Sequence, residues 1–429
     1  MLVVATAFEA LAVATSMPAT VRELGRLDLY GWAFSAFMLT NLIGITVGGG
    51  QSDRIGPARV ISAGTVLFAI GLVVSGLAPS MLTIVAGRAL QGFGGGLLFS
   101  AAYAAIARAY RVETQPRVLA VLSSAWVIPG LVGPGVAGLV TEHASWRWVF
   151  LGLVPMPILA TILVLPALRV LPAASGPPAS DERKRIVRSA ELGAGAGLAL
   201  WGLGLEDWQV AAPAVAVGAL LAGDALRALL PPGTLLARAG LPAAVASMAL
   251  LNFAFFGTEA FVPLALDRVR DAPVLLAGGA LTAAAITWTT GAWLPVRLAG
   301  RVRRRTLILI GHAVLAVGLA GTAAVLSVSV PAACILLAWA IAGFGMGLAY
   351  TCLSAAILGF AEPGRAGVAS ASLQLAQVLG AALATGAGGA IVAAPFAGDP
   401  PTLGIAACDG LMLVVLAVSS LAARRVEHA

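Results

Sequence analysis

Three acidic residues lie inside long apolar segments of this sequence, where a carboxyl group is rare and costly. Glu9 lies near the middle of the first segment, Glu259 lies in a segment of the second half, and Asp409 lies in the last segment. A carboxyl group in a cavity of low dielectric constant has its charged form disfavoured and can exchange protons near neutral pH. We therefore expect these residues to carry protons. For Glu9 the alternative is a hydrogen bond that merely joins packed helices, and for Glu259 and Asp409 it is a position at the outer membrane interface.

Arg88 is a fourth charged residue inside an apolar segment, and several amide and aromatic side chains share this setting. A buried guanidinium is expensive, so we expect Arg88 to face a partner or a wet cavity and to assist proton transfer, unless it extends to the nearby membrane interface. Candidates for lining a substrate cavity are Gln91, Tyr350, Gln374 and Gln377. Gln374 and Gln377 share one helix face, where they could instead join helices, and Tyr350 could instead contact lipid.

The composition of the chain requires a membrane to position these residues. Of 429 residues, 60% are hydrophobic and 10% are charged, and the mean hydropathy is +0.97. Soluble domains carry roughly 25% charged residues. Because a membrane-spanning helix needs about 20 apolar residues, the chain has room for a dozen or more spans. These values exclude a soluble globular protein and predict an all-α integral membrane protein.

The order of the apolar stretches predicts two six-helix bundles. The first six stretches run near 1–20, 30–50, 60–78, 81–107, 118–141 and 148–168, and the last six near 241–265, 273–296, 306–327, 331–360, 366–394 and 402–423. We thus expect an N-terminal bundle at 1–168, a cytoplasmic linker at 169–188, an inserted helical hairpin with its connecting loop at 189–240, and a C-terminal bundle with a short cytoplasmic tail at 241–429. The hairpin raises the count to 14 spans; 12 is the alternative if the hairpin lies on the membrane surface.

The basic residues are concentrated in alternate loops, which predicts the orientation of the chain. With the N-terminus in the cytoplasm, most of the 26 Lys and Arg residues fall on the cytoplasmic side, and the exceptions in outer loops are Arg22, Arg26, Arg147, Arg268 and Arg270. By the positive-inside rule, we expect a multi-pass protein of the plasma membrane with both termini in the cytoplasm. The same distribution explains the net charge of +7 without a nucleic acid partner.

Glycine-rich stretches recur between the two bundles. The stretch Gly92-Phe93-Gly94-Gly95-Gly96-Leu97 has a counterpart at 343–348, and Gly64 and Gly71 have counterparts at Gly311 and Gly318. Two six-helix units in parallel repeat are typical of transporters whose site lies between the halves at mid-membrane. A mere similarity in composition between glycine-rich helices is the alternative.

Two more motifs concern helix ends and helix packing. The loop after the second span contains Gly49, Asp53, Arg54, Gly56 and Arg59. Its carboxylate could bind the N-terminus of a neighbouring helix and latch the cytoplasmic side, or the loop could be only a turn with charges. The fifth span has prolines and glycines at 129–138, which kink a helix and flatten one face for close packing.

Taken together, these motifs resemble those of the major facilitator superfamily, and more closely its fourteen-helix drug:proton antiporter branch. Asp53-Arg54-x-Gly56 is similar to the family's cytoplasmic loop signature, Arg88-x-x-Gln91-Gly92-x-Gly94 to a fourth-span signature implicated in proton transfer, and Gly133-Pro134-x-x-Ala137-Gly138 to a fifth-span antiporter signature. Glu9 precedes Pro18 by the nine positions that separate an acidic residue and a proline in the family's first span. The resemblance covers the whole chain and implies a major facilitator fold.

Some positions depart from the family pattern. Glu9 stands where the family usually has Asp, and Ala137 stands where the fifth-span signature has its first Gly. The loop at 297–305 is basic but lacks the Asp of the corresponding first-half loop. We therefore expect the first half to build most of any cytoplasmic latch. For His312, near an expected helix end, we expect solvation at the membrane interface.

The resemblance implies a secondary active transporter rather than an enzyme. We expect export of hydrophobic or cationic small molecules in exchange for protons, by alternating access. Glu9 would carry the proton, Arg88 would respond to the charge of Glu9, and Asp53 would hold the cytoplasmic side closed. A proton gradient would supply the energy, because the sequence lacks a Gly-x-x-x-x-Gly-Lys-Ser/Thr nucleotide loop, and we expect no cofactor or metal.

The expected partners are the substrate, protons and the lipid bilayer, with the chain acting as a monomer. Export of a lipid or an endogenous secondary metabolite is the alternative function. A membrane enzyme or a sensor without transport is a more remote alternative, because such enzymes usually cluster His or carboxylate residues, and the three histidines of this chain are far apart.

Overall fold

The structure is a computed structural model that describes residues 2–110, 127–170, 182–298, 301–360 and 366–426, together with Thr114 and Val118. Residues 171–181 of the predicted linker, the start of the predicted fifth span and residues 427–429 lie outside this part. Within it, the chain is helical and contains no strand. The prediction of an all-α architecture is thus confirmed for the described residues.

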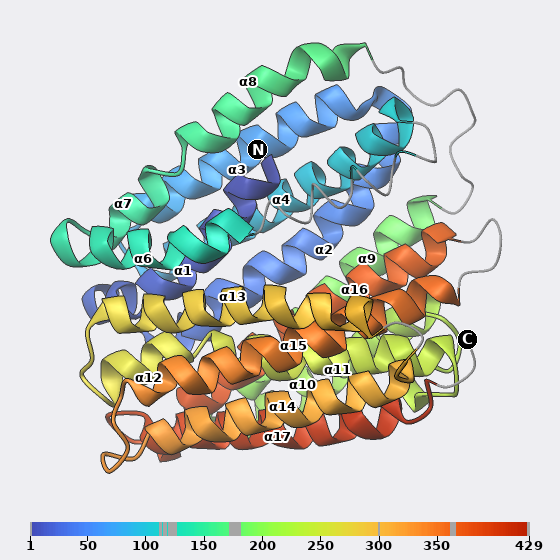
Figure 1. The fold of residues 1–429 in the computed structure, drawn as a ribbon. Helices are drawn as coiled ribbons and strands as arrows, with labels where there is room; N and C mark the ends of the chain where they lie inside the picture. The colour runs from blue at the N-terminus through green and yellow to red at the C-terminus, as the bar shows by residue number, and fades with distance from the viewer. Residues whose placement is uncertain are drawn as a thin grey trace.

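The helices form two halves joined by a hairpin (Figure 1). The N-terminal half contains α1 (Leu2–Leu24), α2 (Tyr30–Ile55), α3 (Pro57–Gly76), α4 (Met81–Ala109), α6 (Val127–His143), α7 (Trp146–Leu151) and α8 (Pro155–Arg169). The hairpin consists of α9 (Glu182–Leu203) and α10 (Trp208–Leu229). The C-terminal half contains α11 (Leu241–Glu259), α12 (Val262–Arg268), α13 (Val274–Arg297), α14 (Arg304–Val325), α15 (Cys334–Gly359), α16 (Ala366–Val392) and α17 (Thr402–Ala423). Short 3-10 helices occur at Leu27–Leu29, Thr234–Leu236 and Pro395–Ala397.

Glycines make the same helix contacts in both halves. A Cβ atom on Gly92 of α4 would collide with the carbonyl oxygen of Phe37 in α2, and one on Gly343 of α15 would collide with that of Ala284 in α13. Both repeats thus bring backbones into direct contact, which only small residues permit. The recurrence of the glycine motif reflects equivalent packing in space and not composition alone.

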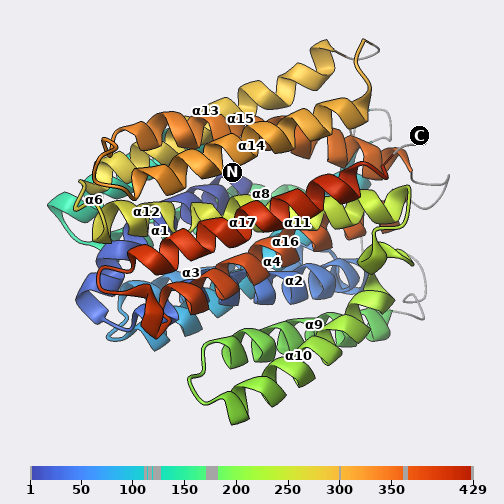
Figure 2. The ribbon, with the colours of Figure 1, turned by 90° about the horizontal axis from the view of Figure 1, so that it is seen from below.

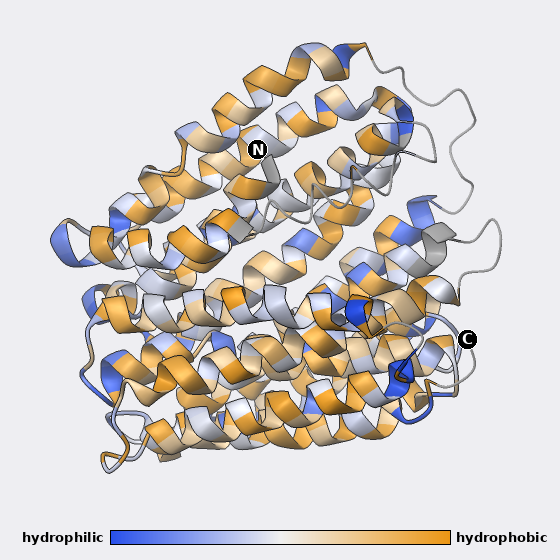
Figure 3. Cartoon of the chain, viewed as in Figure 1, coloured by the Kyte–Doolittle hydropathy of each residue, from blue (hydrophilic) through white to orange (hydrophobic). Residues whose placement is uncertain are grey.

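Twelve helices within the described ranges are long and apolar enough to cross a membrane. Figure 3 shows apolar residues along the middle of the helices and polar residues mainly near their ends. The twelve include α10 but not α6, described over 17 residues, or α9, whose first turn contains charged residues. The chain is therefore a multi-pass membrane protein, and 12 spans, the alternative count, is compatible with its helices.

Several helix boundaries differ from those expected. The hairpin's first helix begins at Glu182, within the range predicted to be linker, because Glu, Arg and Lys are strong helix formers and an acidic residue in the first turn complements the helix dipole. The sixth stretch is divided into α7 and α8 around Gly152, just before Pro155. Hydrophobicity alone does not reveal such breaks, since both parts are apolar.

The hairpin lies to one side of the main bundle (Figure 2). Leu192 of α9 packs in one cluster with Leu42 of α2 and Leu379 of α16. Thr46 of α2 and Ser189 of α9 also form a hydrogen bond of 2.9 Å. The first hairpin helix therefore contacts both halves along the line where α2 and α16 meet.

The two halves lie together at one end of the molecule and diverge toward the other, the right-hand end of Figure 1. At the joined end, Gly31 of α2 packs against Gly389 of α16. On the other side of the molecule, Gly278 of α13 packs against the carbonyl of Pro134 in α6. Two glycine contacts thus close the space between the halves at this end.

Candidate functional site

Glu9 and Arg88 form an ion pair in the interior of the N-terminal half. Glu9 of α1 is fully buried, and Arg88 of α4 is 2% exposed. The Arg88 guanidinium donates hydrogen bonds to the Glu9 carboxylate, to Oε1 of Gln91 at 3.1 Å and to the carbonyl of Ala33 at 3.0 Å. It also lies over the ring of Phe37, 4.3 Å from the ring centroid. The buried charge therefore has a partner, and the alternative in which Arg88 extends to the membrane interface is wrong.

The second oxygen of this carboxylate has no such partner. Among the described residues, Glu9 Oε2 and Gln91 Nε2 are buried without a hydrogen bond. Buried polar atoms in native proteins are rarely left unpaired. An oxygen in this position can accept a proton without breaking an existing hydrogen bond, and that is the chemistry a coupling group requires.

Close packing of α2 and α4 positions the pair. Gly92 lies one turn after Arg88 and lets α4 approach the backbone of α2 near Phe37. Gly71 of α3 similarly lies against the side chain of Gln91. The glycines of the fourth-span motif therefore hold the Arg88 side chain between three helices, where α1 can reach it with Glu9.

The fifth-span motif lies between this site and the other half. An added Cβ on Gly133 of α6 would meet the Phe8 ring, next to Glu9, at 3.7 Å. One on Gly138 would meet Cα of Leu275 in α13 at 3.6 Å. Pro134 contributes the carbonyl that faces Gly278. This helix thus contacts α1, which carries Glu9, on one side and the C-terminal half on another.

The cytoplasmic loop motif is built around a sharp turn between α2 and α3. Gly56 has φ of 85°, a value that favours glycine. Asp53 accepts a hydrogen bond of 2.5 Å from Arg108 at the end of α4, so the carboxylate pairs within its own half. Arg54 and Arg59 are exposed. Gly49, one helical turn before Asp53, lies against the Ser100 side chain of α4.

The predicted cavity residues of the second half lie on two helices: Tyr350 on α15, and Gln374 and Gln377 on α16. The Tyr350 ring lies 5.4 Å from that of Trp288. Tyr350 thus packs against an aromatic ring and is only partly exposed. Gln374, also partly exposed, lies one turn before Gln377 on α16.

Glu259 and Asp409 are separate from the Glu9 pair. Glu259 is partly buried at the end of α11, and Asp409 is 1% exposed in α17, which packs against α11. Asp409 Oδ2 has no hydrogen-bond partner among the described residues. The C-terminal half therefore contains its own buried carboxyl group, away from the fourth-span motif.

Three polar contacts that join the two halves were not predicted. Tyr30 of α2 donates a hydrogen bond of 2.7 Å to the carbonyl of Ala260, Ser35 bonds Thr385 of α16 at 2.9 Å, and Arg22 of α1 forms an ion pair with Asp267 of α12. Aromatic and hydroxyl residues are ordinary in membrane helices, so their presence in the sequence does not indicate a contact between the halves. Asp267 lies between two predicted spans, beside Arg268 and Arg270, so its burial carried no sequence signal either.

The expectation for His312 is wrong. The side chain is 1% exposed, and its Nε2 lies 2.8 Å from the Ser419 hydroxyl, which also bonds Ser247 at 3.0 Å. These polar residues lie on three different helices, α14, α17 and α11. The hydrogen bond to Ser419 makes burial of the His312 side chain favourable. The sequence around His312 does not reveal this bond, because the partner lies on another helix.

Comparison with known proteins agrees with these features. The sequence profile described as Major Facilitator Superfamily matches residues 1–385. A Mycobacterium tuberculosis protein named "Probable multidrug-efflux transporter" is 28% identical over 435 residues, which cover 96% of this chain and 90% of that protein. An Aspergillus aculeatus protein named "Acurin A biosynthesis cluster MFS-type transporter" is 27% identical over 158 residues, 37% of this chain and 28% of that protein.

The fold has counterparts among solved structures. The crystal structure of an auto-inhibited peptide transporter of the POT family superposes with a TM-score of 0.71 at 15% sequence identity, covering all of this chain and 97% of that one. At this identity the likeness concerns the fold alone. It agrees with the arrangement of the helices in two halves.

Proposed function

The chain belongs to the major facilitator superfamily, and we propose that it is a proton-coupled exporter of hydrophobic or cationic small molecules. It is a membrane transporter and not an enzyme. The observation that carries the proposal is the buried pair of Glu9 and Arg88, in which one Glu9 oxygen has no hydrogen bond to any residue that the structure describes. A proton gradient would drive the exchange without a bound cofactor.

In this mechanism, the proton and the substrate compete through the charge of Glu9. When Glu9 is ionised, it neutralises Arg88 and holds α1 against α4. Protonation removes this attraction and leaves the guanidinium with Gln91 and the Ala33 carbonyl. A cation entering the cavity favours ionised Glu9 and thus release of the proton, so the two ligands exclude each other.

Alternating access would follow from the contacts between the halves. The glycine contacts and the Tyr30 and Ser35 hydrogen bonds close one end. We assign this end to the outer side of the plasma membrane, because the loop motifs with the most basic residues lie at the other end, and both termini then belong to the cytoplasm. The structure would correspond to a state open to the cytoplasm, in which a monomer collects its substrate.

The substrate class is inferred from the aromatic side chains around Trp288 and from the names of the relatives. The Trp288 ring of the C-terminal half contacts the rings of Phe256 and Tyr350, and aromatic faces attract lipophilic cations. The name of the mycobacterial relative, multidrug efflux, supports the same class.

The test is transport into inverted membrane vesicles that are energised by a proton gradient, with a fluorescent lipophilic cation as substrate. We expect the wild type to accumulate the dye and Glu9→Gln to lose the gradient-dependent part. Glu206→Gln, which alters an exposed carboxylate between α9 and α10, is the matched control and should transport normally. Gradient-dependent uptake that persists in Glu9→Gln would overturn the role of Glu9.

Export of an endogenous metabolite is the second candidate, and the name of the fungal relative favours it. The same cavity could select one compound instead of many. Uptake of several unrelated cations by the wild type would exclude a narrow exporter. If correctly inserted protein transports none of them, the proposal of multidrug export fails and metabolite export is favoured.

A further inference from the structure

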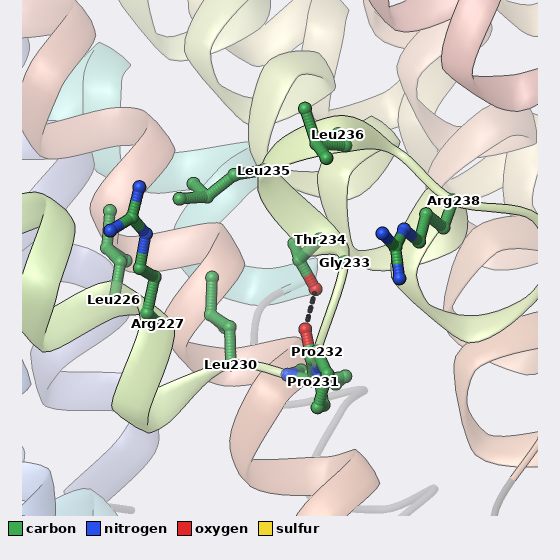
Figure 4. Close-up of a pocket in the computed structure, with 10 residues that line it drawn as sticks. All are labelled: Leu226, Arg227, Leu230, Pro231, Pro232, Gly233, Thr234, Leu235, Leu236 and Arg238. Atoms are coloured by element: carbon green, nitrogen blue, oxygen red, sulfur yellow. Dashed lines mark hydrogen bonds between the residues drawn. The ribbon is translucent and has the colours of Figure 1, made fainter.

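A cavity of about 410 Å³ lies outside the proposed transport site, where the hairpin joins the C-terminal half (Figure 4). Its wall consists mainly of leucine and proline side chains, with one arginine from each end of the segment. The lining residues include Leu226, Arg227, Leu230, Leu235, Leu236 and Arg238. The cavity therefore combines an apolar surface with positive charge.

The two arginines have no acidic partner. Among the residues that the structure describes, neither Arg227 nor Arg238 has a carboxylate within ion-pair distance. The nearest acidic residue in the sequence, Asp224, is 2.5 Å from Arg188 of α9. In Figure 4, Arg227 and Arg238 lie on opposite sides of the cavity, with Leu230 and Leu235 between them. The positive charge of this site is thus available to a ligand.

The cavity also lies at the level where a membrane helix ends. It begins in the last turn of α10, a candidate membrane span, and ends just before α11 starts at Leu241. Leu235 and Leu236 are 55% and 68% exposed, which is unfavourable in water but not beside lipid chains. Arg425 donates hydrogen bonds of 3.3 Å to the carbonyls of Leu236 and Ala237, and thereby fixes the segment to the C-terminal half.

We propose that this cavity binds one anionic phospholipid. Arg227 and Arg238 attract its anionic head group from the two sides of the cavity, and an acyl chain lies along Leu226, Leu230 and Leu235. Basic pockets at the ends of membrane helices suit anionic head groups, whereas a neutral lipid gains little from unpaired arginines. This site does not depend on the proposed transport mechanism.

Native mass spectrometry of the full chain in detergent tests the proposal, with phosphatidylglycerol and phosphatidylcholine titrated separately. We expect one phosphatidylglycerol to bind more tightly than phosphatidylcholine. Arg227→Gln/Arg238→Gln should weaken phosphatidylglycerol binding about tenfold or more. Arg301→Gln/Arg303→Gln removes the same charge from another loop at this end of the molecule and should leave the affinity within about twofold.

Two further experiments test whether the site binds the phosphate of a lipid or a free phosphate. Leu235→Ser keeps both arginines and should also weaken lipid binding, because it removes part of the acyl-chain surface. Glycerol 3-phosphate should not displace the lipid; displacement at equal concentration would show a free-phosphate site and overturn the proposal. Equal losses in the two double variants would also overturn it, since they would show only an effect of net charge. If the pocket double variant is unfolded by its melting curve, Arg227→Gln alone and Leu235→Ser decide the question.

Discussion

Gly31 at the start of α2 and Gly389 near the end of α16 pack backbone against backbone, so that an added Cβ on either glycine would lie 2.7 Å from Cα of the other. Each belongs to a different half of the transporter. Contact at this distance exists only while the two halves are closed at this end. The pair therefore reports and stabilises one conformation.

Gly389→Ala should shift the protein away from this conformation. Overpacking costs about 1–3 kcal/mol, which changes the ratio of two states by roughly fivefold to 150-fold. Double electron–electron resonance between spin labels at Arg59→Cys and Arg303→Cys, at the far end of the two halves, measures the shift. We expect shorter distances between the two labels in Gly389→Ala, because the labelled end closes when the Gly31–Gly389 end opens.

The matched control for this variant is Gly410→Ala in α17, where an added Cβ would have no atom within 4 Å. Its distance distribution should equal that of the wild type. If Gly389→Ala and Gly410→Ala give the same distribution, the glycine contact does not control the conformation.

The second prediction concerns the stability of the buried ion pair. Removing one partner of a buried pair leaves an uncompensated charge and costs about 3–5 kcal/mol. Arg88→Gln should lower the free energy of unfolding by this amount, measured by tryptophan fluorescence in mixed detergent micelles. Glu9→Gln/Arg88→Gln should lose less than the sum of the two single variants, because no charge then remains buried.

Arg26→Gln is the control for this set of Glu9 and Arg88 variants. Arg26 donates to Asp28 at 2.8 Å, but both side chains are exposed, so its replacement should leave the unfolding curve nearly unchanged. Strict additivity of Glu9→Gln and Arg88→Gln would mean that the pair does not stabilise the protein.

The sequence predicted those features that depend on one segment or on a repeated motif. Charged residues in apolar stretches led to Glu9 and Arg88, since burying either alone is costly. The repeated glycines led to equivalent packing in the two halves, because close helix contact requires small residues at regular spacing. These signals lie within single helices and can be read without knowledge of the fold.

Contacts between the halves were beyond such reasoning. Tyr30 and Ser35 make their hydrogen bonds to residues more than 200 positions away, and their types are ordinary in membrane helices. The burial of His312 depends likewise on Ser419 from another helix. The sequence does not state which helix faces meet, so the partners of these polar side chains could not be assigned.

The third prediction concerns the turn between α2 and α3. Gly56 has φ of 85° and ψ of 152°, a region that is essentially restricted to glycine. Gly56→Ala should therefore reduce stability by about 1–3 kcal/mol, measured as the midpoint of unfolding in detergent. Gly223→Ala in α10, where an added Cβ meets no atom within 4 Å, should leave stability unchanged or raise it slightly, because alanine favours helices. Equal effects of the two replacements would contradict a special role of the turn geometry.

The fourth prediction separates two roles of Asp53. In this conformation Asp53 pairs with Arg108 of its own half, but a latch must act when the halves close at this end. Asp53→Asn should therefore slow dye transport about tenfold and leave the melting temperature nearly unchanged, since an exposed pair contributes little stability. The charge exchange Asp53→Arg/Arg108→Asp restores the local pair but not a carboxylate at position 53. Transport that stays slow in the exchange variant supports a latch to the other half, whereas recovery to the wild-type rate would show that the pair with Arg108 is all that Asp53 provides.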